Sequence, residues 1–269
     1  MLNTLLLASF CLLPQDPPEP GPEPEVEQTE VDNISPKEAI ALLKEGLGGK
    51  DYAAQAALLE NLGMIPDKGV VKEVAKALKS KDQTVQLAAL TALRFNTDST
   101  ALKELTKQKK NKKIIDVEEL AEEYYYALGQ HGDKKAIDIL ASGLYSGAKN
   151  SKIIRARLLS LGHIRHIDSC EALMGLLKSR GGKRGHSMGQ MNEFRTAMAV
   201  LTGEDKGKNT TDWIQWWNDV KKSLEISEEE WPLEKRGAQR QWQTLWATPQ
   251  EKEEMRKKAQ EKKKEKEEG

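Results

Sequence analysis

The sequence predicts an all-α fold, an α-solenoid of stacked helical hairpins that ends in a Trp-rich C-terminal cap. A Leu residue, followed in three of four cases by Gly, recurs at Leu62, Leu93, Leu128 and Leu161, with spacings of 31, 35 and 33 residues. A period in this range is typical of stacked repeats. Between these anchors the apolar residues recur every three to five positions, as on one face of a helix, and no two-residue strand alternation is present.

The chain is expected to start with an export signal followed by a spacer. Leu5–Leu13 is an apolar run with the length of a signal hydrophobic region, too short to span a bilayer. We therefore expect a signal peptide over 1–14 and a location in the periplasm or cell envelope; the alternative is a disordered apolar terminus. Phe10 precedes Cys11 where a lipobox has a small residue, so no lipid anchor is expected. Residues 15–34 hold seven acidic residues and no Lys or Arg, which predicts a disordered, Pro-rich linker.

The solenoid is expected over 35–222, and Ser35-Pro36-Lys37-Glu38 has the pattern of a capping box at its first helix. In each repeat a first helix ends at the Leu anchor, and a second helix follows a short break that contains an Asp able to cap it. One such hairpin cannot bury its apolar face alone, so it must stack on its neighbours. The aligned apolar columns contain Ala54, Val85, Leu120 and Ile153 in the first helices and Val71, Leu102, Ile137 and Cys170 in the second.

The columns also assign several residues that could be read as functional. Cys170 stands where other repeats place aliphatic residues, which favours a small core residue over a reactive thiol. Tyr125 falls in a core column, and we expect Tyr124 and Tyr126 to pack between repeats and not to form a stacking patch. Lys109 interrupts an apolar column within a Lys-rich run, so the second helix of that repeat should end early.

The C-terminal part departs from the repeat pattern. Residues 180–189 are rich in Gly and basic residues and predict a mobile loop. All six Trp residues follow between Trp213 and Trp246, and five of them lie three or four apart, which predicts a contact that closes the end of the stack. We expect a Trp-containing extension over 223–249 and a charged tail over 250–269, the latter a lone solvated helix or disordered.

The repeats resemble HEAT repeats, including the HEAT-like set of phycobilisome lyases. The Leu-Gly ends of the first helices and the aliphatic columns across 50–180 carry this resemblance. The stretch Leu201-Thr202-Gly203-Glu204-Asp205-Lys206-Gly207, followed by Trp213 and Trp216-Trp217, is similar to an ending found in many exported bacterial HEAT-repeat proteins. The resemblance covers 36–222 and implies an interaction module without known chemistry. HEAT stacks line their concave face with the second helices, but the sequence does not indicate which face binds a partner.

No catalytic, cofactor-binding or metal-binding residues are expected. Arg184 follows Gly182-Lys183 where a phosphate loop has Ser or Thr. The four His residues lack an HExxH pattern, a Cys partner or a following Glu. We therefore predict that the protein is not an enzyme and binds no cofactor. An enzymatic role like that of a lyase, or a chaperone-like role, is a third interpretation.

Positive charge is the remaining functional signal, although the whole chain has a formal net charge of +0. Residues 147–186 hold nine basic residues against two acidic ones. Such a surface attracts acidic proteins, nucleic acid or anionic polysaccharide, or it is an ordinary solvated face. The expected partner-binding residues are Lys107, Lys109, Lys110, Arg155, Arg157, Arg165, Arg180, Lys183 and Arg184.

The leading hypothesis is a non-catalytic scaffold that binds a protein or peptide, possibly an acidic one, in the cell envelope. The alternative is a protein that binds nucleic acid or another polyanion through the basic fourth repeat and the loop that follows it. Export would separate the chain from nucleic acid and so disfavours the alternative. Leu5–Leu13 is too short to span a bilayer and no other segment is apolar enough, so no transmembrane span is expected.

Overall fold

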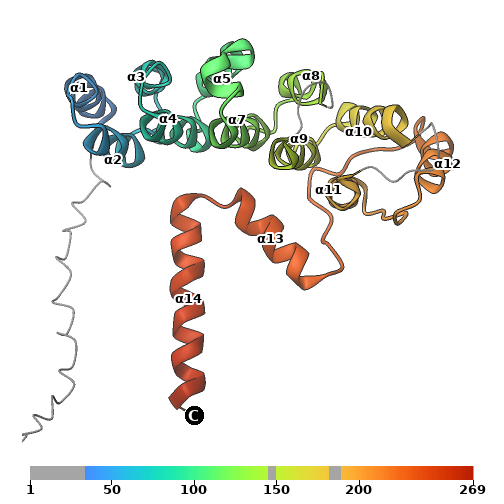
Figure 1. Ribbon diagram of the computed structural model, residues 1–269. Coiled ribbons are helices and arrows are strands. Elements are labelled where there is room, and N and C mark those ends of the chain that lie inside the picture. Colours follow the sequence, from blue (N-terminus) through green and yellow to red (C-terminus); the bar gives the residue numbers. More distant parts are fainter. Residues whose placement is uncertain (1–33, 145–149, 182–188, 269) are drawn as a thin grey trace, which may run out of the picture. The chain divides into compact units, whose positions relative to one another are not determined.

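The computed structural model describes residues 34–144, 150–181 and 189–268, and within these ranges all regular structure is helical (Figure 1). This confirms the all-α prediction. The helices are α1 (Pro36–Gly46), α2 (Tyr52–Leu62), α3 (Lys68–Ala77), α4 (Gln83–Phe95), α5 (Ser99–Lys107), η2 (Gln108–Lys110), α6 (Lys112–Ile115), α7 (Glu118–Gln130), η3 (Lys134–Ala136), α8 (Ile137–Ala141), α9 (Ser151–His163), α10 (Ile167–Gly181), α11 (Met191–Thr202), α12 (Thr210–Val220), α13 (Arg236–Trp246) and α14 (Pro249–Glu268).

Within residues 34–222 the helices form two layers, which confirms the α-solenoid. The helices α2, α4, α7, α9 and α11 each pack on the next and form what we call the first-helix layer. The helices α1, α3, α5, α8, α10 and α12 cover it and form the second-helix layer. The stack therefore continues beyond the four predicted repeats, because α11 and α12 form a further hairpin in the same arrangement.

The glycines of the Leu-Gly pairs allow successive first helices to approach closely. A Cβ atom at Gly129 would lie 2.5 Å from the Cβ of Ser160, and one at Gly162 would lie 2.6 Å from the Cα of Ala197. Gly63 faces Ala92 in the same way, at 2.6 Å. Any side chain at these positions would push the helices apart, so the motif that sets the period is a packing device.

Side-chain caps separate the helices largely as predicted. Ser35 and Glu38 form the capping box of α1. Asp67 caps α3 and Asp98 caps α5 by accepting from backbone N–H groups. Asp168 differs from the prediction, since it lies within the first turn of α10 and its carboxylate contacts His166.

The expected break at Lys109 is present. Helix α5 ends at Lys107, and a 3-10 turn (η2) and the four-residue α6 replace its last turns. Ile114 of α6 is fully buried, so it restores the apolar contact that Lys109 does not supply. The same columns correctly assign Cys170 and Tyr125 to the core, and Tyr124 and Tyr126 are buried with them.

The Leu201-Thr202-Gly203 motif forms the turn between α11 and α12. Gly203 ends α11 with a φ of 76°, a left-handed conformation that favours glycine. The Asp205 carboxylate accepts from Arg195 and from the N–H of Gly207 at 2.9 Å. The indole N–H of Trp213 donates to the Gly207 carbonyl at 2.8 Å. The motif is therefore a structural closure of the last hairpin.

The two Trp clusters occupy different places, which corrects the prediction of a single contact at the end of the stack. Trp213 and Trp217 are buried in the last hairpin, where Trp213 packs edge-on against Phe194. Trp242 and Trp246 of α13 instead fold back along the first-helix layer and pack against α7 and α9. The connection after α12 allows this return, which no local spacing could indicate.

Candidate functional site

The C-terminal part of the chain lies on the first-helix layer, and residues 227–247, called the docked segment below, make the contacts. A buried Arg at the end of α4 holds its far end. Arg94 is 4% exposed, and its Nη1 lies 3.2 Å from Glu123 Oε2. Its Nε donates to Gln130 Oε1 at 3.2 Å, and its Nη2 donates to the Leu245 carbonyl. Burial lowers the pKa of Arg94 and raises the pKa of Glu123, and the attraction within the pair opposes both shifts.

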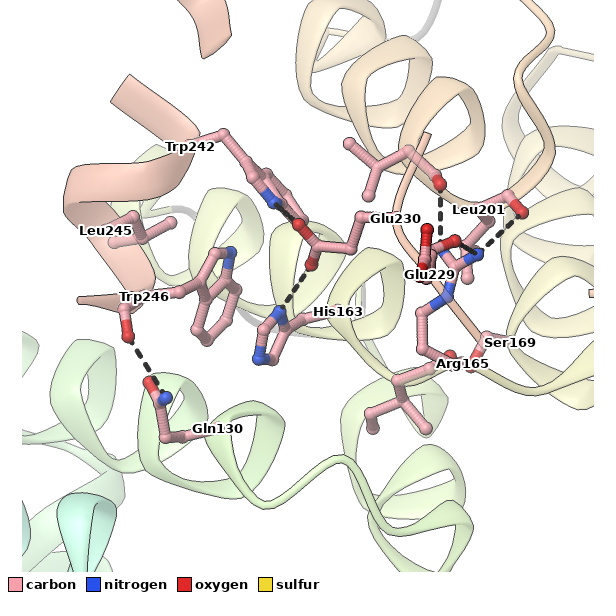
Figure 2. A network of polar contacts seen from close by, with 12 residues as sticks. Gln130, His163, Arg165, Ser169, Leu201, Glu229, Glu230, Trp242, Leu245 and Trp246 are labelled. Carbon is pink, nitrogen blue, oxygen red and sulfur yellow. Dashed lines mark hydrogen bonds and ion pairs between the residues drawn. The ribbon is translucent and has the colours of Figure 1, made fainter. Parts of the chain in front are cut away.

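An aromatic stack holds the apolar face of α13. The Trp246 ring lies parallel to the His163 ring (Figure 2), with ring centroids 3.9 Å apart. Trp246 also packs edge-on against Tyr126, at 5.9 Å between ring centroids. Trp242 contacts Trp246 at 5.5 Å between ring centroids. Gln130 donates to the Trp246 carbonyl at 3.1 Å. Three successive first helices, α4, α7 and α9, thus contribute to one binding surface.

Glu230 connects the docked segment to itself and to α9. One carboxylate oxygen lies 3.1 Å from His163 Nδ1, and the other accepts from the Trp242 indole N–H at 2.8 Å (Figure 2). Burial favours a raised pKa for Glu230, but the hydrogen bonds from His163 and Trp242 outweigh it and hold the pKa below its ordinary value. The carboxylate is therefore charged at neutral pH and fixes both rings.

Arg165 binds the start of the docked segment through backbone carbonyls. Its guanidinium donates to Ser227 at 2.7 Å, to Glu229 at 2.6 Å and to Val200 at 2.7 Å. The Trp231 N–H also donates to the Val200 carbonyl, at 3.0 Å. Recognition here is of main chain and does not depend on side-chain identity.

The fit of the docked segment is incomplete at two points. Within the described residues, the Trp246 indole nitrogen is buried without a hydrogen-bond partner. A groove of about 300 Å³ also remains beside α13, lined by Arg155, Leu159 and Glu193 together with Trp242 and Leu245. Both defects lie on the surface that α13 covers.

Seven of the nine predicted partner-binding residues lie in the described part of the chain, and the structure does not bring these seven together. Arg157 is 4% exposed and donates to the carbonyls of Ile139, Leu140 and Ser142, so it supports the hairpin of α8 and α9. Arg165 binds the docked segment as described. Arg155 lines the groove beside α13, where its side chain is 43% exposed.

The remaining predicted residues lie elsewhere. Lys107 pairs with Glu104 at 2.6 Å. Lys109 and Lys110 line an open cavity of about 640 Å³ in the second-helix layer, opposite Asp138 of α8. Arg180 lies in α10, whereas Lys183 and Arg184, with most of the predicted 180–189 loop, lie outside the described residues.

Sequence reasoning did not identify Arg94, Glu123, Gln130 or Glu230, and it treated His163 only as an unsupported metal ligand. One signal was available, because Arg94 replaces the Gly of the Leu-Gly pair in the second repeat. A charged residue at a buried position where the other repeats have glycine indicates a role besides helix packing. Arg94 has this role because it binds the backbone of the docked segment.

The chemistry of this surface is that of recognition. It offers guanidinium donors, amide donors and aromatic faces, which bind backbone carbonyls and large apolar side chains. Among the described residues, no three His, Cys, Asp or Glu side chains form a cluster that could hold a metal ion. None of the described helices is both long and apolar enough to cross a membrane.

Comparison with known proteins agrees with the fold. Residues 40–123 match the family of HEAT repeats, which is less than half of the 269-residue chain. The match runs from within α1 to the first half of α7. No curated protein matches the sequence.

Proposed function

We propose that this chain is a non-catalytic interaction scaffold that binds a helical segment of a partner protein on α4, α7 and α9. One observation carries the proposal: this surface already holds a helix, α13, through aromatic contacts and through donors to backbone carbonyls. HEAT repeats in general serve as surfaces for protein partners. The docked segment lies on the first-helix layer, so we propose that this layer and not the second-helix layer is the binding face.

We place this activity in the cell envelope because Leu5–Leu13 has the composition of an export signal. An acidic partner is part of the proposal, since Arg155 lines the groove next to α13 and Lys109 and Lys110 line the cavity on the other layer. Sequencing the N-terminus of the native protein tests the location. A chain that retains residues 1–14 contradicts export.

Site-specific photo-crosslinking tests the binding surface. A photoreactive amino acid at Arg155, in the groove, should trap one defined protein from the envelope fraction, whereas the same group at Lys68, exposed on α3, should not. Equal crosslinking at both positions, or none at Arg155, would contradict the proposal.

A further inference from the structure

We infer that the docked segment is a displaceable occupant of the first-helix layer. The partner that displaces it is an amphipathic helix with two large apolar side chains four residues apart and a carboxylate that reaches Arg155. This inference rests on the proposed function, because it concerns the same surface. Three features of the site support it.

The first feature is the buried indole N–H of Trp246. A donor that leaves water without finding an acceptor weakens the contact that buries it. The neighbouring Trp242 has the same side chain, but its N–H donates to Glu230 at 2.8 Å. A partner helix with an apolar residue at the Trp246 position fills the same space without the unpaired donor. The docked segment therefore binds this surface more weakly than a helix without the unpaired donor would.

The second feature is the groove of about 300 Å³ beside α13. Arg155 lies on its wall, and its polar contacts with described residues are long, at 3.9 Å to Glu193 and 3.3 Å to the Tyr126 hydroxyl. A helix that presents a Glu or Asp toward Arg155 would fill the groove and form a closer ion pair. α13 has no acidic residue in its sequence, RGAQRQWQTLW.

The third feature is that different contacts hold the two ends of the docked segment, with the hydrogen bond from Trp242 to Glu230 between them. Arg165 and Val200 bind residues 227–231 through the backbone, while the α13 contacts depend on the Trp rings and on Arg94. α13 can therefore leave while the start of the segment stays bound. A tethered helix competes with a free partner at an effective concentration on the order of millimolar.

Binding of a synthetic peptide to the full chain tests the inference. The probe is a fluorescent peptide of residues 227–247, and the receptors are the wild-type chain and the Trp242→Ala/Trp246→Ala chain. Because the variant's own helix no longer competes, it should bind the probe at least about tenfold more tightly than wild type. If this variant does not fold by circular dichroism, Trp242→Ala alone replaces it.

Two matched probes test the role of the unpaired donor. Replacing Trp246 of the peptide by 2-naphthylalanine, which has no N–H, should tighten binding by about fivefold or more. The same replacement at Trp242, whose N–H is paired with Glu230, should weaken binding. Equal effects at the two positions would overturn the inference.

The remaining outcomes separate the inference from the proposed function. Equal probe binding by wild type and variant, or none by either, overturns displacement, whereas a specific crosslink at Arg155 still supports the scaffold. Tighter probe binding by the variant without a specific crosslink at Arg155 would support displacement of α13 and contradict the proposed scaffold function. Concentration-dependent dimerisation of the wild-type chain would assign the surface to a second copy and contradict a different protein as the occupant.

Discussion

Among single residues, the position that follows the Leu anchor has a packing role in three repeats and a binding role in the second. Gly63, Gly129 and Gly162 sit where the next first helix approaches within contact distance of the backbone. Arg94 occupies the same column in the second repeat and is buried against Glu123. The three glycines therefore allow the first helices to pack closely, whereas Arg94 binds the docked segment.

Gly129→Ala tests the packing role. The added methyl group would lie 2.5 Å from Ser160 Cβ, so we expect the free energy of unfolding to fall by about 1–3 kcal/mol. Gly175→Ala is the matched control, because Gly175 is an exposed helical position with nothing within 4 Å of the new Cβ. That change should stabilise by about 0.5–1 kcal/mol in denaturant unfolding. A tolerated Gly129→Ala would contradict the packing role.

At the scale of elements, the two C-terminal helices behave differently because their sequences differ. α13 places Ala238, Trp242, Leu245 and Trp246 on one face, and that face lies against the solenoid. α14 consists mostly of Lys and Glu and starts with a capping box formed by Thr248 and Glu251. It contacts the stack near its start, where Lys252 Nζ lies 5.5 Å from the centroid of the Phe95 ring. Only α13 has the apolar surface to dock.

Docking of α13 should depend on pH through Glu230. Its pKa in the folded chain lies below the ordinary value of 4.5, so the folded state binds fewer protons at this carboxyl than the unfolded state. The contribution of Glu230 is therefore complete above about pH 4.5 and is lost as the pH falls through the lower, folded pKa. Trp fluorescence between pH 7 and pH 3 should report the release of Trp242.

Two variants control this prediction. Glu230→Gln should weaken docking at neutral pH and remove the acid transition, whereas Glu234→Gln, an exposed neighbour, should leave it unchanged. Far-UV circular dichroism should stay constant while the fluorescence changes, since the repeats themselves remain folded. A transition that persists in Glu230→Gln would assign it to another group.

At the scale of the molecule, the docked segment ties distant repeats together. Arg94 in the second repeat binds the Leu245 carbonyl, and Arg165, in the turn between the two helices of the fourth repeat, binds Ser227 and Glu229. A solenoid normally has contacts only between neighbouring repeats. These long-range contacts should make the second to fourth repeats unfold together.

Arg94→Met tests this coupling. It leaves the Glu123 carboxylate buried without its partner, so we expect a loss of about 3 kcal/mol in the free energy of unfolding and a broader denaturant transition. Arg94→Met/Glu123→Met should recover much of the stability, because it removes both charges. Lys107→Met breaks the exposed pair with Glu104 and should cost less than about 1 kcal/mol. Similar losses for the two single variants would contradict the role of Arg94.

The helices, their period and most of their core could be predicted from the amino-acid sequence. Local spacing and capping chemistry specify these features, so Cys170, Tyr125 and the early end of α5 at Lys107 could be predicted from alignment of the repeats. The glycines at the helix contacts also stand out in the sequence, but the residues that they contact on the next helix do not.

The place where the chain folds back onto the solenoid depends on long-range contacts and could not be predicted. The contacts of Arg94 with Leu245 and of His163 with Glu230 join residues 151 and 67 positions apart, and no periodic pattern relates such distant positions. The basic residues illustrate the same limit, because charge counts cannot distinguish buried Arg157 from half-exposed Arg155. Burial and pairing depend on which surfaces meet, and that is a property of the packed chain.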